Sequence, residues 1–239
     1  MTVDGLGCAE HALRSCAFAS EPRCRGCARA LPAMLPAHSL CAACRRSPRG
    51  YQRLLAFGSY RSGTALREWI LALKHGGRRE LALPLGTLLA ERLAESLAET
   101  GTRAPAAVLV PVPLHPLRRL ERGFDQARLL AEAAAEAARL DYLPALQRRR
   151  WTPPQGAPGA VSRSANVRDA FRLVRRQRAR LAGRTVFLVD DVVTSGATVA
   201  ACAAALRVAE PLEVSVLCLA RADPAADVDA QEADTLTGS

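Results

Sequence analysis

The residues best suited to chemistry lie where an apolar run, residues 186–189, ends in two adjacent carboxylates, Asp190 and Asp191. Five small residues follow two positions later, and a helical pattern begins among them: Thr194, Ser195, Gly196, Ala197 and Thr198. A helix amino terminus exposes backbone N–H groups, and a glycine lets the backbone approach an anion closely, so this segment suits a phosphate. The carboxylates suit ribose hydroxyls or a Mg²⁺ ion that bridges to phosphates. Together they predict a ligand with a phosphate at one end and a diol in the middle, such as a ribose 5-phosphate.

A simpler interpretation of this segment is a strand followed by an ordinary N-capped helix. Thr194 or Ser195 would then cap the helix with its side-chain oxygen, a position in which serine and threonine are common. Capping alone requires neither two acids at the strand end nor a run of small residues, so we favour the phosphate site.

Cysteines suggest a second site, because six of the eight lie between Cys8 and Cys44. Cys24 and Cys27 form one Cys-x2-Cys pair, and Cys41 and Cys44 form another, with 13 residues between the pairs. In a reducing compartment this spacing predicts a tetrahedral four-cysteine zinc site, since each short spacer turns two thiolates toward one ion. Zinc would also supply folding energy to a segment with few large apolar residues. The alternative is four free thiols in a mobile arm.

The net charge of +10 is concentrated in one segment. Residues 147–184 contain eleven arginines and a single acid, Asp169, so the rest of the chain sums to zero. Such a local excess favours a polyanionic partner or substrate. The alternative is a genome that uses arginine freely, which agrees with Lys74 being the only lysine.

Hydrophobic patterns predict the elements that position these residues. We expect strands at residues 54–60, 107–110, 185–189 and 214–220, and a further one within 140–146. We expect helices at residues 64–75, 81–100, 124–140 and 197–208, the second of them broken near its start by Pro84. Apolar strands that alternate with helices predict an α/β fold with a parallel sheet covered on both faces. Ligands bind at the C-terminal edge of such sheets, where Asp190 and Asp191 would lie.

Three regions are expected along the chain: a four-cysteine zinc-binding module at residues 1–50, a larger domain at 51–222 and an acidic flexible tail at 223–239. Residues 151–166 are rich in Pro, Gly and Ser and are expected to form a long loop. No run of 18 apolar residues occurs, so no membrane span is expected. The amino end has no apolar core of a secretory signal, so we expect a cytoplasmic protein.

Residues 186–198 resemble the phosphoribosyl pyrophosphate (PRPP) signature of type I phosphoribosyltransferases. Further motifs are similar to those of the ComF family (ComFC or GntX-like), which places a zinc-binding module before a phosphoribosyltransferase domain. These motifs are Pro111-Val112-Pro113-Leu114-His115, Arg122-Gly123-Phe124-Asp125-Gln126, Thr152, Gln155, Arg163, Asn166 and Phe171. The similarity runs from Cys24 to about Ala220. Two residues depart from the pattern, since Asn is expected at Asp125 and Thr more often at Ser195.

The resemblance implies a parallel-sheet type I phosphoribosyltransferase fold with a small N-terminal zinc module, and it assigns roles. Asp190 and Asp191 would hold the ribose hydroxyls of PRPP, and residues 194–198 would hold its 5-phosphate. The pyrophosphate loop would consist of Val110, Pro111, Val112, Pro113 and Leu114. Lys74 and Arg163 would contact the pyrophosphate, although Lys74 could equally be an ordinary cation at a helix end. Residues 151–166 would close over bound PRPP.

The resemblance also implies a reaction, displacement at C1 of the ribose with Mg²⁺ and release of pyrophosphate. One hypothesis is a PRPP-binding accessory protein of DNA uptake during natural transformation, with single-stranded DNA and the competence machinery as partners. Another is an active phosphoribosyltransferase with an unknown nitrogenous acceptor, and a third is a PRPP sensor. The arginines favour a DNA partner, but only Trp151 and Phe171 lie near them for base stacking. Some of these arginines could instead bind PRPP.

Overall fold

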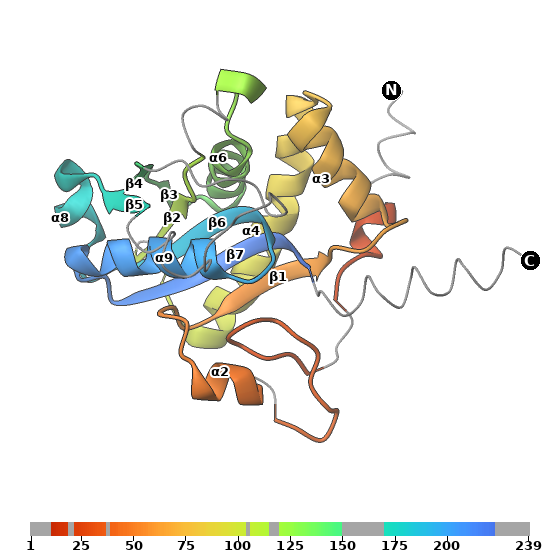
Figure 1. Cartoon of the computed structure of the whole chain (residues 1–239), viewed down its shortest axis with the longest axis horizontal. Helices are drawn as coiled ribbons and strands as arrows, with labels where there is room; N and C mark the ends of the chain where they lie inside the picture. Colours follow the sequence, from red (N-terminus) through yellow and green to blue (C-terminus); the bar gives the residue numbers. More distant parts are fainter. Residues whose placement is uncertain are drawn as a thin grey trace, which may run out of the picture.

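A five-stranded parallel sheet forms the centre of the computed structural model, which describes residues 11–18, 22–36, 39–103, 106–114, 120–149 and 170–222. Its strands follow the order β1-β7-β6-β2-β3 (Figure 1). They are β1 (Leu54–Ser59), β2 (Ala107–Pro111), β3 (Asp141–Tyr142), β6 (Thr185–Val193) and β7 (Glu213–Arg221). Two further strands, β4 (Leu146–Arg148) and β5 (Phe171–Leu173), form a separate antiparallel pair. The predicted parallel α/β fold is confirmed.

Helices cover both faces of this sheet (Figure 1). One face packs against α3 (Ala65–His75), α4 (Ala82–Thr100) and α6 (Gln126–Ala138), and the other against α9 (Ala197–Leu206). Two apolar clusters result, because alternate residues of a strand point to opposite faces. In β6, Phe187 and Val189 join the α3–α4–α6 cluster, whereas Val186 and Leu188 join the α9 cluster.

The observed helices begin and end close to the predicted positions. Thr64 caps α3 by accepting a hydrogen bond from the Arg67 N–H, and Asp125 caps α6 by accepting one from the Arg128 N–H. The predicted break at Pro84 is wrong. Pro84 is the third residue of α4, and in the first turn its missing N–H removes no helical hydrogen bond.

Strand β6 is longer than predicted. The apolar run ends at Val189, but the strand continues through both aspartates to Val193. Its neighbours explain the extension, since Asp190 pairs with Cys218 and Val193 with Arg221 on β7. The two carboxylates therefore project from a hydrogen-bonded strand in the middle of the sheet, and only residues 194–196 form the connection to α9.

The cysteine-rich segment lies beside β1, the edge strand of the sheet, and contains the short helix α2 (Ala42–Arg46) (Figure 1). The Leu54 N–H donates to the Arg25 carbonyl oxygen at 2.7 Å, and the Phe18 N–H donates to the Phe57 carbonyl oxygen at 2.9 Å. These bonds cover part of an edge that would otherwise be open to another chain. The expected tail at residues 223–239 lies outside the described residues. None of the helices within the described ranges has the length and apolar character needed to cross a membrane.

Candidate functional site at the C-terminal edge of the sheet

The two strand aspartates face opposite sides of the sheet. Asp191 is buried on the α3 side, and its Oδ2 lies 3.0 Å from the Nζ of Lys74, in the last turn of α3. Its Oδ1 accepts a hydrogen bond from the Val192 N–H at 2.6 Å. Asp190 faces α9, and its Oδ1 accepts from the Asp191 N–H at 2.9 Å. Asp191 thus has a cation beside it, whereas Asp190 is held by a backbone donor.

Asp190 is the unusual titratable group of this edge. Burial raises its pKa to about 8, the nearby Asp191 adds to the effect, and Lys74 opposes it. In the ligand-free protein the Asp190 carboxyl therefore tends to keep its proton at neutral pH. A cation or a hydroxyl donor that prefers the carboxylate would displace this proton on binding.

The connection from β6 to α9 has the backbone that a phosphate site requires. Gly196 directly precedes α9 and adopts a φ of +79°, a left-handed conformation that favours glycine. The Ala197 N–H donates to the Oγ of Ser195 at 3.3 Å. The first N–H groups of a helix have no partner within the helix, so an anion placed at the start of α9 would find donors there.

The predicted pyrophosphate loop follows β2, the strand next to β6. The Val112 N–H donates to the Val189 carbonyl oxygen at 2.9 Å, and the Leu114 N–H donates to the Oδ2 of Asp125 at 3.1 Å. The Oδ1 of Asp125 accepts from the Arg128 N–H at 3.2 Å. Both bonds need an acceptor, and a carboxylate supplies two acceptor oxygens where asparagine supplies one. Aspartate therefore suits this position, although the resemblance predicts asparagine.

Cations gather beside Asp191 at the predicted pyrophosphate side. The pKa of His75 is lowered by burial and by the charges of Arg122 and Lys74, which places all three groups near one another. Arg79 donates to the Gly123 carbonyl oxygen at 3.2 Å and stacks over the ring of Phe124. The sequence analysis identified Lys74 but missed His75 and Arg79. Their signal was the pair of basic residues on each side of Gly76 and Gly77, which lies close to the Arg122 motif in space but not in sequence.

Most of the predicted ligand-binding residues thus share one edge of the sheet. Lys74, residues 110–114, the two aspartates and residues 194–198 belong to α3, to neighbouring strands and to the start of α9. Arg163 and the predicted closing loop at residues 151–166 lie outside the described residues. In this structure Lys74 pairs with Asp191, so its contact with pyrophosphate stays a prediction.

The four cysteines of the Cys-x2-Cys pairs form one cluster, in which all four Sγ atoms lie within 4.8 Å of one another. Tetrahedral Zn–S bonds of about 2.3 Å place the sulfurs about 3.8 Å apart. The Sγ atoms of Cys27 and Cys41 are 3.8 Å apart, so the cluster fits a four-coordinate metal. Burial raises the pKa of Cys27 to about 12. Burial also acts on Cys41, but hydrogen bonds from the Cys44 N–H and neighbouring thiols outweigh it and lower its pKa to about 7.

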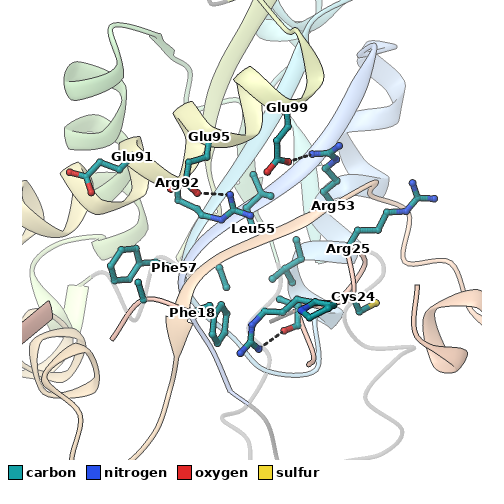
Figure 2. A pocket seen from close by; sticks show the side chains of 16 residues that line it. Phe18, Cys24, Arg25, Arg53, Leu55, Phe57, Glu91, Arg92, Glu95 and Glu99 are labelled. Carbon is teal, nitrogen blue, oxygen red and sulfur yellow. Dashed lines mark hydrogen bonds and ion pairs between the residues drawn. The ribbon is translucent and has the colours of Figure 1, made fainter. Parts of the chain in front are cut away.

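A cavity of about 420 Å³ separates part of the cysteine-rich segment from α4 and β1 (Figure 2). Phe18 and Phe57 line it, and ion pairs of Arg53 with Glu99 at 3.1 Å and of Arg92 with Glu95 at 2.9 Å lie along α4. Of the predicted site residues, only Cys24 borders it. The cavity is therefore distinct from the C-terminal edge of the sheet.

Comparison with known proteins agrees with this geometry. The family model described as "Phosphoribosyl transferase domain" matches residues 85–237. "DNA utilization protein YhgH" of Escherichia coli (strain K12) is 34% identical over 185 residues, 77% of this chain and 78% of that protein. The protein of the same name in Salmonella typhimurium (strain LT2) is 33% identical over 208 residues, 86% and 88% of the two chains. "Competence protein F" of Haemophilus influenzae is 34% identical over 121 residues, 50% and 52% of the chains. The chain therefore belongs to the phosphoribosyl transferase domain family and is a relative of YhgH and Competence protein F, as the ComF resemblance of its motifs implied.

Proposed function

We propose that this protein binds PRPP at the C-terminal edge of its sheet and acts in the uptake or use of DNA. The observation that carries PRPP binding is the β6 carboxylate pair followed by the Gly196 turn, in a chain of the phosphoribosyl transferase domain family. Asp190 and Asp191 would bind the ribose hydroxyls, and residues 194–198 the 5-phosphate. The names of the relatives, which refer to DNA utilization and competence, support the DNA-related role.

The residues at this edge also fit Mg²⁺, which prefers carboxylate and phosphate oxygens. Asp190 would be one of its ligands. Because the pKa of this carboxyl is raised, it would release a proton when the cation binds. When bound with PRPP, Mg²⁺ would neutralise charge on the pyrophosphate. The protein would orient the ribose through Asp190 and Asp191, while Lys74 and the loop at residues 110–114 hold the other end. For the cysteine cluster we propose structural Zn²⁺, in the reducing cytoplasm.

An active phosphoribosyltransferase is the alternative, and one observation favours it. A cavity of about 630 Å³ adjoins the predicted pyrophosphate loop and is lined by Pro113, Leu114, Tyr142 and Arg148, among others. A nitrogenous acceptor seated there would lie beside the leaving pyrophosphate. Release of pyrophosphate from PRPP in the presence of an acceptor would favour this alternative, whereas tight binding without turnover favours the accessory role.

The arginine-rich segment supports a polyanionic partner. Within the described residues, Arg184 pairs with Asp141 at 2.7 Å, so part of this charge is neutralised. Arg172, Arg175 and Arg176, on β5 and η3 (Arg175–Gln177), have no ion-pair partner in the part of the chain that the structure describes. Their charges are available to phosphates, and we propose single-stranded DNA as the partner.

Calorimetric titration with PRPP and Mg²⁺ tests the main proposal. We expect the wild type to bind in the micromolar range, about −8 kcal/mol. A double Asp190→Asn, Asp191→Asn variant should bind at least about 100-fold more weakly, because it loses two charge-assisted sets of hydrogen bonds. Asp141→Asn makes the same chemical change on β3 and should bind as the wild type does. A folded, zinc-loaded wild type that fails to bind PRPP would refute the proposal.

The DNA partner is tested by fluorescence anisotropy with a single-stranded oligonucleotide. Affinity should fall steeply between about 50 mM and about 200 mM salt, because binding releases counterions. Replacing Arg172, Arg175 and Arg176 by Gln should weaken binding and reduce the salt slope by about 2. The charge-matched control replaces Arg61, Arg67 and Arg92 by Gln and should keep the wild-type slope. Absent or salt-insensitive binding would contradict a DNA partner.

A further inference from the structure

Two arginines connect the cysteine-rich segment to the predicted 5-phosphate loop. Arg49, between α2 and β1, donates from Nη1 to the Ser195 carbonyl oxygen at 2.5 Å. Arg221, the last residue of β7, is buried and donates from Nε to the Cys27 carbonyl oxygen at 2.9 Å and from Nη1 to the Val193 carbonyl oxygen at 3.2 Å. The two carbonyl groups on the loop flank Thr194. The loop is thus held on both sides of its centre by side chains that also contact the cysteine-rich segment.

Both arginines are linked to the cysteine cluster through the backbone. The carbonyl oxygen of Cys27 accepts a hydrogen bond from Arg221, and Arg49 follows α2, the short helix that carries Cys44. Hydrogen-bond donors around a metal site fix the orientation of its ligands and are sensitive to whether the metal is bound. A metal bound to Cys27 and Cys44 would therefore fix the backbone beside both arginines, which links the cluster to the loop.

The shape of the loop depends on Arg49 as well. A Cβ atom at Gly196 would lie 2.7 Å from the Nη1 of Arg49 and 3.3 Å from the hydroxyl of Tyr51. Tyr51 is 7% exposed, and its hydroxyl lacks a hydrogen-bond partner among the described residues. Arg49 and Tyr51 thus fill the space that the absent side chain of Gly196 leaves. Without Arg49, the left-handed turn before α9 would lose both a hydrogen bond and its packing on this side.

Elsewhere the cysteine-rich segment is packed less closely against the sheet. The cavity of about 420 Å³ in Figure 2 lies between Cys24, α4 and β1, with charged side chains along one wall. On that side, a shift of the segment would break its backbone hydrogen bonds to Leu54 and Phe57 of β1, which do not reach the predicted ligand site. On the other side it would break the Arg49 and Arg221 bonds at the loop. Among the predicted ligand-binding segments, the loop is therefore the one that a change in the cysteine cluster would affect most.

We propose that Arg49 is a positioning residue for the 5-phosphate of PRPP, and that the metal-loaded cysteine cluster keeps it in place by fixing α2 and the chain that follows it. Metal binding at the cluster then sets the affinity of the loop for a phosphate, although no cluster residue would touch the ligand. This inference rests on the proposed binding of PRPP. It predicts that ligands with a 5-phosphate respond to Arg49, whereas pyrophosphate alone does not.

The experiment compares three ligands, PRPP, ribose 5-phosphate and pyrophosphate, on four proteins by calorimetry or by competition. Arg49→Ala should lower the affinity for PRPP and for ribose 5-phosphate by the same factor, about 10-fold, as expected for the loss of one hydrogen-bonded charge. Pyrophosphate binding should not change. Arg49→Lys should restore part of the affinity, because an ammonium can still donate to the Ser195 carbonyl oxygen. Arg46→Ala removes an exposed arginine two residues after Cys44 and should match the wild type.

A second measurement reads the loop directly, by hydrogen exchange at residues 194–199. Exchange should accelerate in Arg49→Ala, and also in the wild type after partial removal of metal by a chelator, with little change in α6 as the internal reference. Wild-type affinity for ribose 5-phosphate in Arg49→Ala, or equal weakening of all three ligands, would overturn the inference. Unchanged exchange in Arg49→Ala would refute the positioning role of Arg49, and unchanged exchange in the wild type after metal removal would refute the coupling. A wild type that binds no PRPP would instead refute the proposed function.

Discussion

Replacing Asp190 by asparagine is expected to raise the melting temperature of the ligand-free protein at neutral pH while it weakens PRPP binding. The pKa of Asp190 is raised to about 8 by burial and by Asp191, so the folded protein disfavours the charged carboxylate. Asparagine resembles the protonated carboxyl in shape, and its side-chain oxygen can still accept the hydrogen bond from the Asp191 N–H. The variant therefore keeps this local contact and avoids the cost of burying a charge.

The sign of the pH dependence follows from the same shift. Between about pH 4 and about pH 8 the unfolded chain has ionised Asp190, whereas the folded chain still holds its proton. The protonated Asp190 side chain thus makes its full contribution to the stability of the wild type at low pH. This contribution is lost as the pH rises through this window. The asparagine variant does not titrate, so its advantage in melting temperature should grow from about pH 5 to about pH 8 and then level off.

Asp191→Asn is the matched control, because Asp191 has a cation beside it, whereas Asp190 is held by a backbone donor. Asp191 is 3% exposed and lies 3.0 Å from Lys74, so removing its charge leaves a partly buried ammonium without its partner. We expect a loss of about 1–3 kcal/mol in the free energy of unfolding at neutral pH. Thermal melting of both variants across the pH range distinguishes the two. A lower melting temperature for Asp190→Asn at pH 8, or a pH-independent difference, would contradict the assignment.

PRPP binding should also depend on the proton of the Asp190 carboxyl. If the ligand and its cation require the Asp190 carboxylate, binding releases a proton below pH 8, and affinity should rise by up to about 10-fold per pH unit between pH 6 and pH 8. Calorimetry in two buffers that differ in ionisation enthalpy measures the released proton. Binding without proton release at pH 7 would show that Asp190 has the same protonation state in the free protein and in the complex.

The sequence predicted most of the elements that carry the site, because each has a strong local signal. The strand at residues 107–110 and the helix at 64–75 were found within a residue or two, from an apolar run in one case and a capped amphipathic pattern in the other. The full length of β6 was missed, since Asp190 and Asp191 interrupt the apolar pattern. Pairing with β2 and β7 continues the strand where its own composition does not.

Contacts between distant segments could not be read from local patterns. Lys74 was singled out as the only lysine, but its ion pair with Asp191 depends on how α3 packs on the sheet. Arg49 and Ser195 are 146 residues apart in sequence, and no motif marks Arg49 among 33 basic residues. Arg221 gave a weak signal, because a charged residue directly follows an apolar strand. Its two backbone acceptors become evident only when the cysteine-rich segment and β6 are brought together.

Loss of the metal site should have the largest effect on stability. Protein purified without chelator is expected to contain about one zinc per chain. Cys27→Ser should lose this metal, because a serine hydroxyl is a poor ligand where a thiolate is needed, and structural zinc contributes most of the folding energy of small modules. The described cysteine-rich segment has only a small apolar cluster around Cys24, Cys27 and Cys44, with Leu31 and Leu40 partly buried, so little else would hold it folded.

The loss should extend beyond the module. The hydrogen bonds that the Arg25 and Cys27 carbonyl oxygens accept would break, which leaves the buried Arg221 guanidinium without one of its acceptors. Each such unsatisfied group costs about 1–3 kcal/mol. We therefore expect Cys27→Ser to melt in two steps, with the module unfolding first and the sheet melting at a lower temperature than in the wild type.

Cys16→Ser is the control for this experiment. Cys16 lies outside the cluster, is partly buried and donates its thiol to the Ala12 carbonyl oxygen at 3.3 Å, a bond that a serine hydroxyl can replace. This variant should retain one zinc and melt in a single step. Metal analysis with differential scanning calorimetry on both variants separates the effect of losing a ligand from the effect of losing a thiol. A wild type that is metal-free and stably folded would show that packing and not metal holds the module against the sheet. A Cys27→Ser variant with full zinc content would show that Cys27 is not a required ligand.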